Sequence, residues 1–173
     1  MSKETRLSCT TRDPALRSGI FFCPLSYFYQ ENRKMDIKAE TLQNLIHGPY
    51  ASDREQGGLL GGKVGLISTV YVDKGLDIGK RCSYAPDTDT CNRVISDWLE
   101  KGLDFYGIFH THMDGTELSD SDVLYIARIM RALADYTDSL YFPVVIPKRE
   151  VKVYKTLYQD GKMKIMNDKI III

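Results

Sequence analysis

Hydrophobic positions along the chain follow two spacings, and their order predicts a domain that mixes helices with strands. Three segments repeat apolar residues every three to four positions, the spacing of a helix with one buried face. These segments are 39–47, 88–101 and 119–136. Shorter apolar runs bounded by turn residues are typical of strands, and they cover 55–62, 63–72, 104–110, 140–146, 150–157, 162–166 and 170–173. We expect an α+β fold in which helices flank one mixed, mostly antiparallel sheet.

Glycine and aspartate divide these segments at defined points. Gly48 and Gly102 follow two of the expected helices, where glycine commonly ends a helix. The pair Asp160–Gly161 is a strong hairpin signal, and a turn is expected near Gly61–Lys63 to join the first two long strands. The last run, 170–173, is expected to be an edge strand.

The first 34 residues differ from the remainder. Residues 1–17 are polar and aperiodic, whereas 19–29 are rich in aromatic residues and suit either an extra strand or a packing arm. The regular pattern begins at Met35. We therefore expect a flexible N-terminal extension over 1–34 and one folded domain over 35–173.

Composition and charge narrow the possible partners. The 23 Lys and Arg residues balance the 23 Asp and Glu residues, and the sequence holds no long basic run. This argues against nucleic acid or an anionic membrane as the main partner. No apolar stretch approaches the about 20 residues that a membrane span needs.

The four cysteines suggest a reducing compartment. Cys9, Cys23, Cys82 and Cys91 show no Cys-x-x-Cys spacing, so we expect reduced thiols and a cytoplasmic protein. A bridge between Cys82 and Cys91 is the alternative.

Candidate chemistry gathers where the 104–110 strand ends. His110 and His112 are two positions apart, so an extended backbone directs both side chains to one face. Asp122 falls in the first turn of the next helix, behind Ser119. Two imidazoles, one carboxylate and an open fourth position are the usual ligands of a catalytic zinc ion. Each half alone is weak, because His-x-His is often a surface feature and Ser-x-x-Asp is how many helices begin.

A further motif, Glu55-x-x-Gly58-x-Leu60-x-Gly62, lies about fifty residues upstream of His110-x-His112. Together with Ser119-x-x-Asp122, in this order and separation, it resembles the JAMM (MPN-plus) zinc metallopeptidase family, over Met35 to about Met166. The resemblance implies a cytidine-deaminase-like sheet fold, and the short chain is most similar to stand-alone prokaryotic members.

The resemblance also implies roles for five residues. His110, His112 and Asp122 would hold Zn²⁺ with water as the fourth ligand, and zinc brings the pKa of such water to about 7. Glu55 would take the proton from that water and deliver it to the leaving amine. Ser119 would donate a hydrogen bond to the tetrahedral oxyanion.

The sequence departs from the family pattern in the loop after the histidines. Met113 stands where proline is usual, and the loop 113–118 holds six residues where seven are usual. This makes Asp120, and more remotely Asp114, alternatives to Asp122. Asp122 is preferred because it alone completes Ser-x-x-Asp.

Relatives that the sequence resembles cleave peptide or isopeptide bonds after the C-terminal tail of ubiquitin or a ubiquitin-like protein. We expect such a protein, or its conjugate, as the substrate; the oligomeric state is left open. An extended tail would add to an exposed strand edge, for which the strand after Gly58 is the candidate. Two other functions remain open: a non-catalytic MPN scaffold that binds partners, and a zinc amidohydrolase that acts on small conjugates.

Overall fold

The structure is a computed structural model that describes residues 34–50, 54–76 and 84–173. The predicted extension over 1–34, its aromatic segment and Cys82 lie outside the described residues, apart from Lys34. The division into an extension and a domain therefore stays a prediction.

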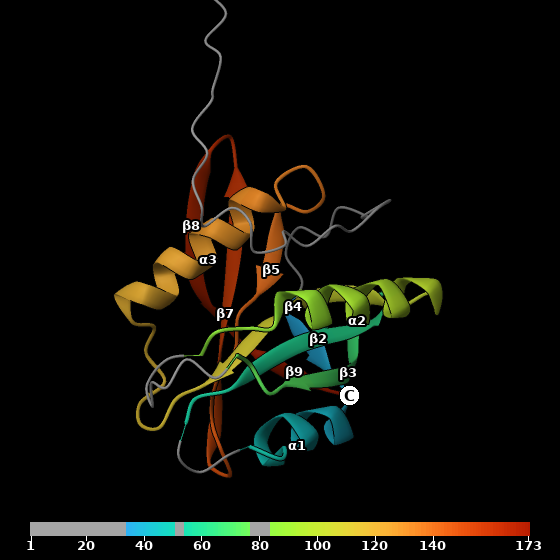
Figure 1. Cartoon of the computed structure of the whole chain (residues 1–173), viewed down its shortest axis with the longest axis vertical. Coiled ribbons are helices and arrows are strands. Elements are labelled where there is room, and N and C mark those ends of the chain that lie inside the picture. The colour runs from blue at the N-terminus through green and yellow to red at the C-terminus, as the bar shows by residue number, and fades with distance from the viewer. Residues whose placement is uncertain (1–33, 51–53, 77–83) are drawn as a thin grey trace, which may run out of the picture.

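One mixed sheet runs through the described part of the chain (Figure 1). Its strands are β1 (Met35–Ile37), β2 (Gly57–Lys63), β3 (Leu66–Asp73), β4 (Asp104–Thr111), β5 (Ser139–Tyr141), β6 (Val144–Ile146), β7 (Glu150–Gln159), β8 (Lys162–Asp168) and β9 (Ile170–Ile172). The order across the sheet is β8, β7, then β5 and β6 end to end, then β4, β2, β3, β1 and β9. Antiparallel pairs predominate. The parallel pairs are those of β1 with β3 and β9, and those of β4 with β5 and β6. The predicted fold class is confirmed.

Helices cover both faces of this sheet. They are α1 (Ala39–His47), α2 (Thr88–Glu100) and α3 (Asp120–Ala132). Figure 1 shows α1 on one side of the sheet and α2 and α3 on the other. Leu42 and Leu45 of α1 pack with Phe109 in one core, whereas Ile95 of α2 and Ile126 of α3 pack in a second core. Within the described residues, no helix is long and apolar enough to cross a membrane.

Two strand predictions differ from the structure for local reasons. The predicted strand 140–146 is two short strands, β5 and β6, separated by Phe142 and Pro143. Pro143 has no N–H to give to a neighbouring strand, which favours an interruption at this point. The first hairpin turns at Val64–Gly65 rather than near Gly61–Lys63.

The expected helix 119–136 is also shorter than its pattern suggests. It ends at Ala132, and the N–H groups of Tyr136 and Thr137 both donate to the carbonyl oxygen of Leu133. Leu133 is buried in the core, so its apolar side chain continued the helical pattern without continuing the helix.

The prediction that the strand after Gly58 forms an exposed edge is wrong. That strand, β2, pairs with β3 on one side and with β4 on the other. The outermost strands of the described sheet are β8 and β9, and the expected edge strand at 170–173 is confirmed as β9. Any tail that adds to this sheet must therefore use a different strand.

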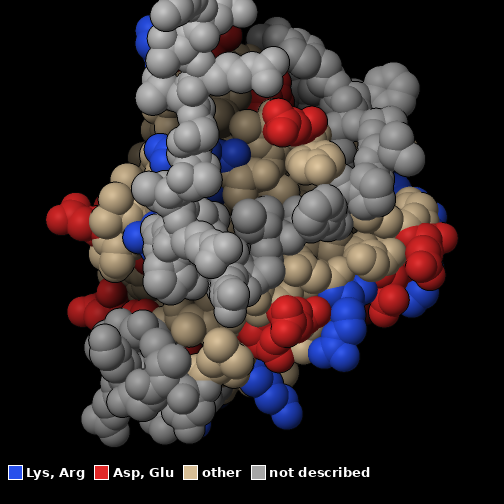
Figure 2. All heavy atoms as spheres, turned by 45° about the horizontal axis from the view of Figure 1, so that its top comes forward, with Lys and Arg blue, Asp and Glu red and all other residues tan. Residues whose placement is uncertain are grey.

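Two further expectations concern thiols and charge. Among the described residues Cys91 is a buried free thiol, whereas Cys82 lies outside them, so the alternative Cys82–Cys91 bridge stays a prediction. Burial, with the nearby Asp73 carboxylate, raises the pKa of that thiol to about 12. On the face shown in Figure 2, acidic and basic side chains of the described residues are interspersed, which fits the formal net charge of zero.

Gly58 is required by close packing at the centre of the sheet. A Cβ atom there would stand 1.8 Å from the carbonyl oxygen of Tyr71 and 2.7 Å from the ring of Phe109. Gly58→Ala is expected to lower the free energy of unfolding by about 1–3 kcal/mol, because backbone and core must both shift. Urea unfolding measures this, and a variant as stable as the parent would contradict the packing.

Val64 occupies an unfavourable conformation in the first hairpin. Its φ is 52° and that of Gly65 is 82°, the left-handed pair that favours Asn-Gly rather than a β-branched residue. Its side chain is 84% exposed, so replacing it removes little packing. Val64→Asn is expected to raise the free energy of unfolding by about 1 kcal/mol. Thermal and urea unfolding should agree; a loss of stability would contradict this account of the turn.

Candidate metal centre

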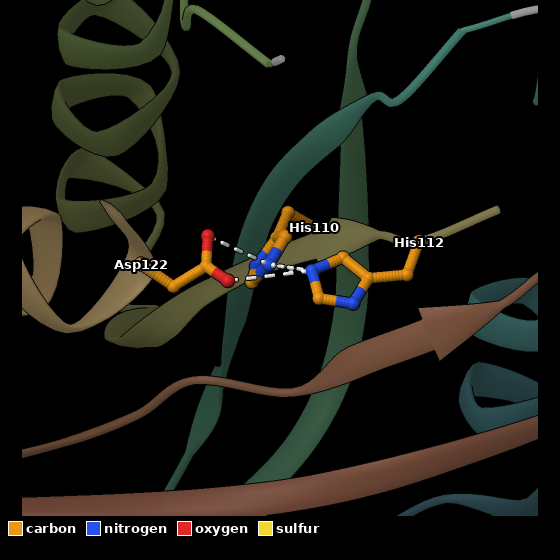
Figure 3. Close-up of side chains that lie close together, drawn as sticks. All are labelled: His110, His112 and Asp122. Carbon is orange, nitrogen blue, oxygen red and sulfur yellow. Dashed lines mark hydrogen bonds and ion pairs between the residues drawn. The ribbon is translucent and has the colours of Figure 1, made fainter. Parts of the chain in front are cut away.

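The end of strand β4 fixes the positions of the two histidines: His110 lies in β4, and His112 follows its last residue, Thr111. His110 lies between Gly57 of β2 and Val144 of β6. The N–H of His110 donates to the carbonyl of Pro143 at 3.1 Å, and the N–H of His112 donates to that of Val145 at 2.9 Å. The backbone between them is extended, so the two imidazoles lie on the same face, as predicted, and Figure 3 shows them converging.

The start of α3 fixes the carboxylate. Ser119 is the N-cap, and its N–H and hydroxyl each donate to Oδ2 of Asp122 at 2.7 Å. The N–H of Asp122 donates back to the Ser119 hydroxyl at 3.2 Å. This reciprocal capping box orients the Asp122 side chain from within its own helix. Its Oδ1 remains directed at His110, 3.3 Å away.

The three side chains meet at separations that suit a metal ion. The two Nε2 atoms are 2.9 Å apart, and Asp122 Oδ2 lies 3.4 Å from Nε2 of His112 (Figure 3). All three ligand atoms lie within 4.8 Å of one another. Tetrahedral ligands about 2.0–2.1 Å from zinc stand about 3.3 Å from each other. The donor set and its spacing therefore fit Zn²⁺, although the geometry does not select one metal.

Hydrogen bonding prepares His112 as a ligand. Its Nδ1 lies 3.2 Å from the carbonyl oxygen of Gly115, which can only accept a hydrogen bond. A proton on Nδ1 leaves the lone pair of Nε2 free to face the cluster, as in most metal-binding histidines. When Nε2 is also protonated it donates to Asp122, and this hydrogen bond raises the pKa of His112, while burial partly opposes the shift.

Asp122 is held in its ionised form. Burial alone would raise the pKa of this carboxyl group, but hydrogen bonds from His110 and His112 lower it well below the usual range for aspartate. Its side chain is 19% exposed, and those of His110 and His112 are 16% and 12% exposed. The charged candidate ligand thus lies in a partly shielded site that solvent still reaches.

Glu55 lies near enough to His110, His112 and Asp122 for their charges to shift its pKa, but it is outside the group of three candidate ligands. Burial raises the pKa of its carboxyl group, while the charges of His112 and His110 lower it. Its position is set through the next residue. The Gln56 N–H donates to the Thr111 hydroxyl at 2.8 Å, and the Thr111 N–H donates to the Gln56 carbonyl at 2.7 Å. This buried pair of hydrogen bonds ties the start of β2 to the residue between the two histidines.

The remaining residues that the sequence suggested for the site, Asp114, Asp120 and Ser119, are all exposed. Among the described residues, the ligand group contains Asp122 and neither Asp114 nor Asp120, both of which are exposed. Ser119 is exposed, and its hydroxyl donates to Asp122 in this structure, so its role toward an oxyanion stays a prediction. Gly115 and Thr111 could not be foreseen from the sequence, since a backbone carbonyl and a buried strand threonine leave no motif.

Comparisons with known proteins show a shared fold and nothing finer. The sequence matches no family model and no curated protein. A Desulfitobacterium hafniense protein solved in solution has a TM-score of 0.58 at 19% identity, over 80% of this chain and 92% of that one. A Salinibacter ruber protein (TM-score 0.48, 15% identity, 80% and 92% covered) and a JAB1/MPN domain protein from Archaeoglobus fulgidus (0.42, 12%, 80% and 99%) are more distant. The first likeness shows a shared fold, and the other two are too distant to carry an argument.

Proposed function

We propose that this chain is a zinc-dependent metallopeptidase of the JAMM type. The observation that carries the proposal is the convergence of His110, His112 and Asp122, from the end of β4 and the start of α3, with Glu55 near enough for their charges to shift its pKa. These four residues are spread over positions 55 to 122 of the sequence, and the folded sheet brings them together. A non-catalytic scaffold would have no need of a complete ligand set with a carboxylate base next to it.

The residues divide the chemistry between them. When bound, Zn²⁺ supplies a Lewis acid that activates water and polarises the scissile carbonyl. Glu55 accepts the proton from water and returns it to the leaving amine, and burial of its carboxyl group makes it a stronger base. The Ser119 hydroxyl rotates from Asp122 to donate to the developing oxyanion.

We further propose that the substrate is the C-terminal tail of a ubiquitin-like protein, joined to a lysine or to a peptide. Support comes from the motif resemblance and from the partly exposed ligands, which suit an extended chain lying across the site. The buried free thiol of Cys91 fits action in a reducing compartment such as the cytoplasm.

A cleavage assay tests this function. The zinc-loaded protein is incubated with a ubiquitin-like protein whose tail is linked to a lysine-containing peptide, and products are identified by mass spectrometry. Cleavage after the tail that a chelator stops and added zinc restores supports the proposal. Hydrolysis of small amides alone would indicate the amidohydrolase, and zinc binding with no cleavage of either substrate would indicate the scaffold.

A further inference from the structure

The loop between the metal ligands, residues 113–118, is held from outside by strand β7. Met113, Asp114, Gly115 and Glu117 are exposed, and Gly115 has a φ of +73°. This same loop supplies the carbonyl that accepts from Nδ1 of His112. The orientation of the imidazole therefore depends on where the loop is fixed.

Tyr154 is the buried anchor for the loop. Its side chain lies in the core, with the residue 6% exposed, and its hydroxyl is 2.9 Å from the carbonyl oxygen of Thr116 and 3.1 Å from Oε2 of Glu117. The anchored peptide group is adjacent to the one that carries the Gly115 carbonyl. Fixing one peptide plane restricts the next. The Tyr154 hydroxyl therefore helps to fix the orientation of the Gly115 carbonyl, which accepts the hydrogen bond from His112.

Lys152 completes the contact from the same strand. Its ammonium group binds Oε1 of Glu117 and lies 5.4 Å from the centre of the Tyr154 ring. The ion pair lowers the pKa of Glu117 and keeps that carboxylate charged. A charged acceptor strengthens the hydrogen bond from the tyrosine hydroxyl.

We propose that Tyr154, with Glu117 and Lys152, is a positioning clamp that sets the metal affinity of the site through the orientation of His112. None of the three touches the three ligand side chains among the contacts of the described residues. The proposal rests on the metal site within the proposed function. The clamp holds the loop 113–118, which is one residue shorter than is usual in the family that the sequence resembles and has Met113 in place of its proline. A short loop without proline gains rigidity from a contact outside itself.

Metal affinity tests the clamp separately from catalysis. Tyr154→Phe removes one hydroxyl and keeps the ring. Its affinity for Zn²⁺, measured by competition with a chromophoric chelator, is expected to fall about tenfold. The visible spectrum of the Co²⁺-loaded protein is expected to change as well. The matched control is Tyr158→Phe, on the same strand and also packed against the core, for which both readouts should match the wild type.

The outcomes are distinguishable. Wild-type metal affinity and spectrum in Tyr154→Phe would overturn the clamp, as would an equal loss in both tyrosine variants. If Tyr154→Phe fails to fold, Glu117→Ala at the exposed end of the contact must lower the affinity instead, and unchanged affinity there would overturn it. Metal binding without tail cleavage would contradict only the proposed function, whereas a wild-type protein that binds no zinc would contradict both.

Discussion

Replacement of His112 by alanine is expected to lower zinc affinity by more than the about 100-fold that loss of an outer-shell partner costs. The substitution removes one of three protein ligands, and a pair formed by His110 and Asp122 leaves the ion with too few fixed donors. Chelator competition on the purified protein measures the change. Peptidase activity is expected to vanish with the metal.

The remaining histidine offers a matched control. His47 is exposed at the C-terminal end of α1 and belongs to no ligand group among the described residues. His47→Ala should bind zinc as the wild type does. Equal affinity in His112→Ala and His47→Ala would show that the metal, if bound, sits elsewhere.

Replacement of Glu55 by glutamine is expected to reduce the cleavage rate by about 100- to 10,000-fold and to leave zinc affinity unchanged. Glutamine keeps the size and polarity of the side chain but cannot accept the proton, and general base catalysis contributes a factor of that order. Glu55 influences the cluster by charge without belonging to the ligand group. Initial rates on the tail-linked substrate and chelator competition, run side by side, measure both effects.

Glu40→Gln controls for the loss of one carboxylate. Glu40 is exposed in the first turn of α1, and its substitution should change neither rate nor metal affinity. A Glu55→Gln variant that retains more than about a tenth of the rate would rule out Glu55 as the base. Loss of zinc in that variant would instead make Glu55 a ligand.

The candidate ligands could be predicted because each one belongs to, or directly follows, a strongly patterned element. The two-residue spacing of His110 and His112 fixes their common face once β4 is a strand. Ser119-x-x-Asp122 forms a capping box and also places Asp122 in the candidate ligand group, so local helix chemistry and the candidate metal site favour the same residues. Helix α1 was predicted to the residue, since its apolar face and Gly48 agree.

The features that could not be predicted from the sequence depend mainly on contacts between segments that are distant along the chain. The central place of β2 follows from pairing with both β3 and β4, which no local pattern encodes. Tyr154 contacts Glu117 across 37 positions, and in the sequence it reads as an ordinary strand tyrosine. The turn at Val64 went against residue preference, because a β-branched residue rarely adopts a positive φ.

Zinc content per chain tests the central claim most directly. The wild-type protein is loaded with Zn²⁺, freed of excess metal and analysed by elemental analysis beside His112→Ala. The account predicts about one zinc per wild-type chain and almost none in the variant, as expected for a single site of two histidines and one aspartate. A wild-type protein that retains no zinc after loading would contradict the metallopeptidase and leave a scaffold that keeps only the fold.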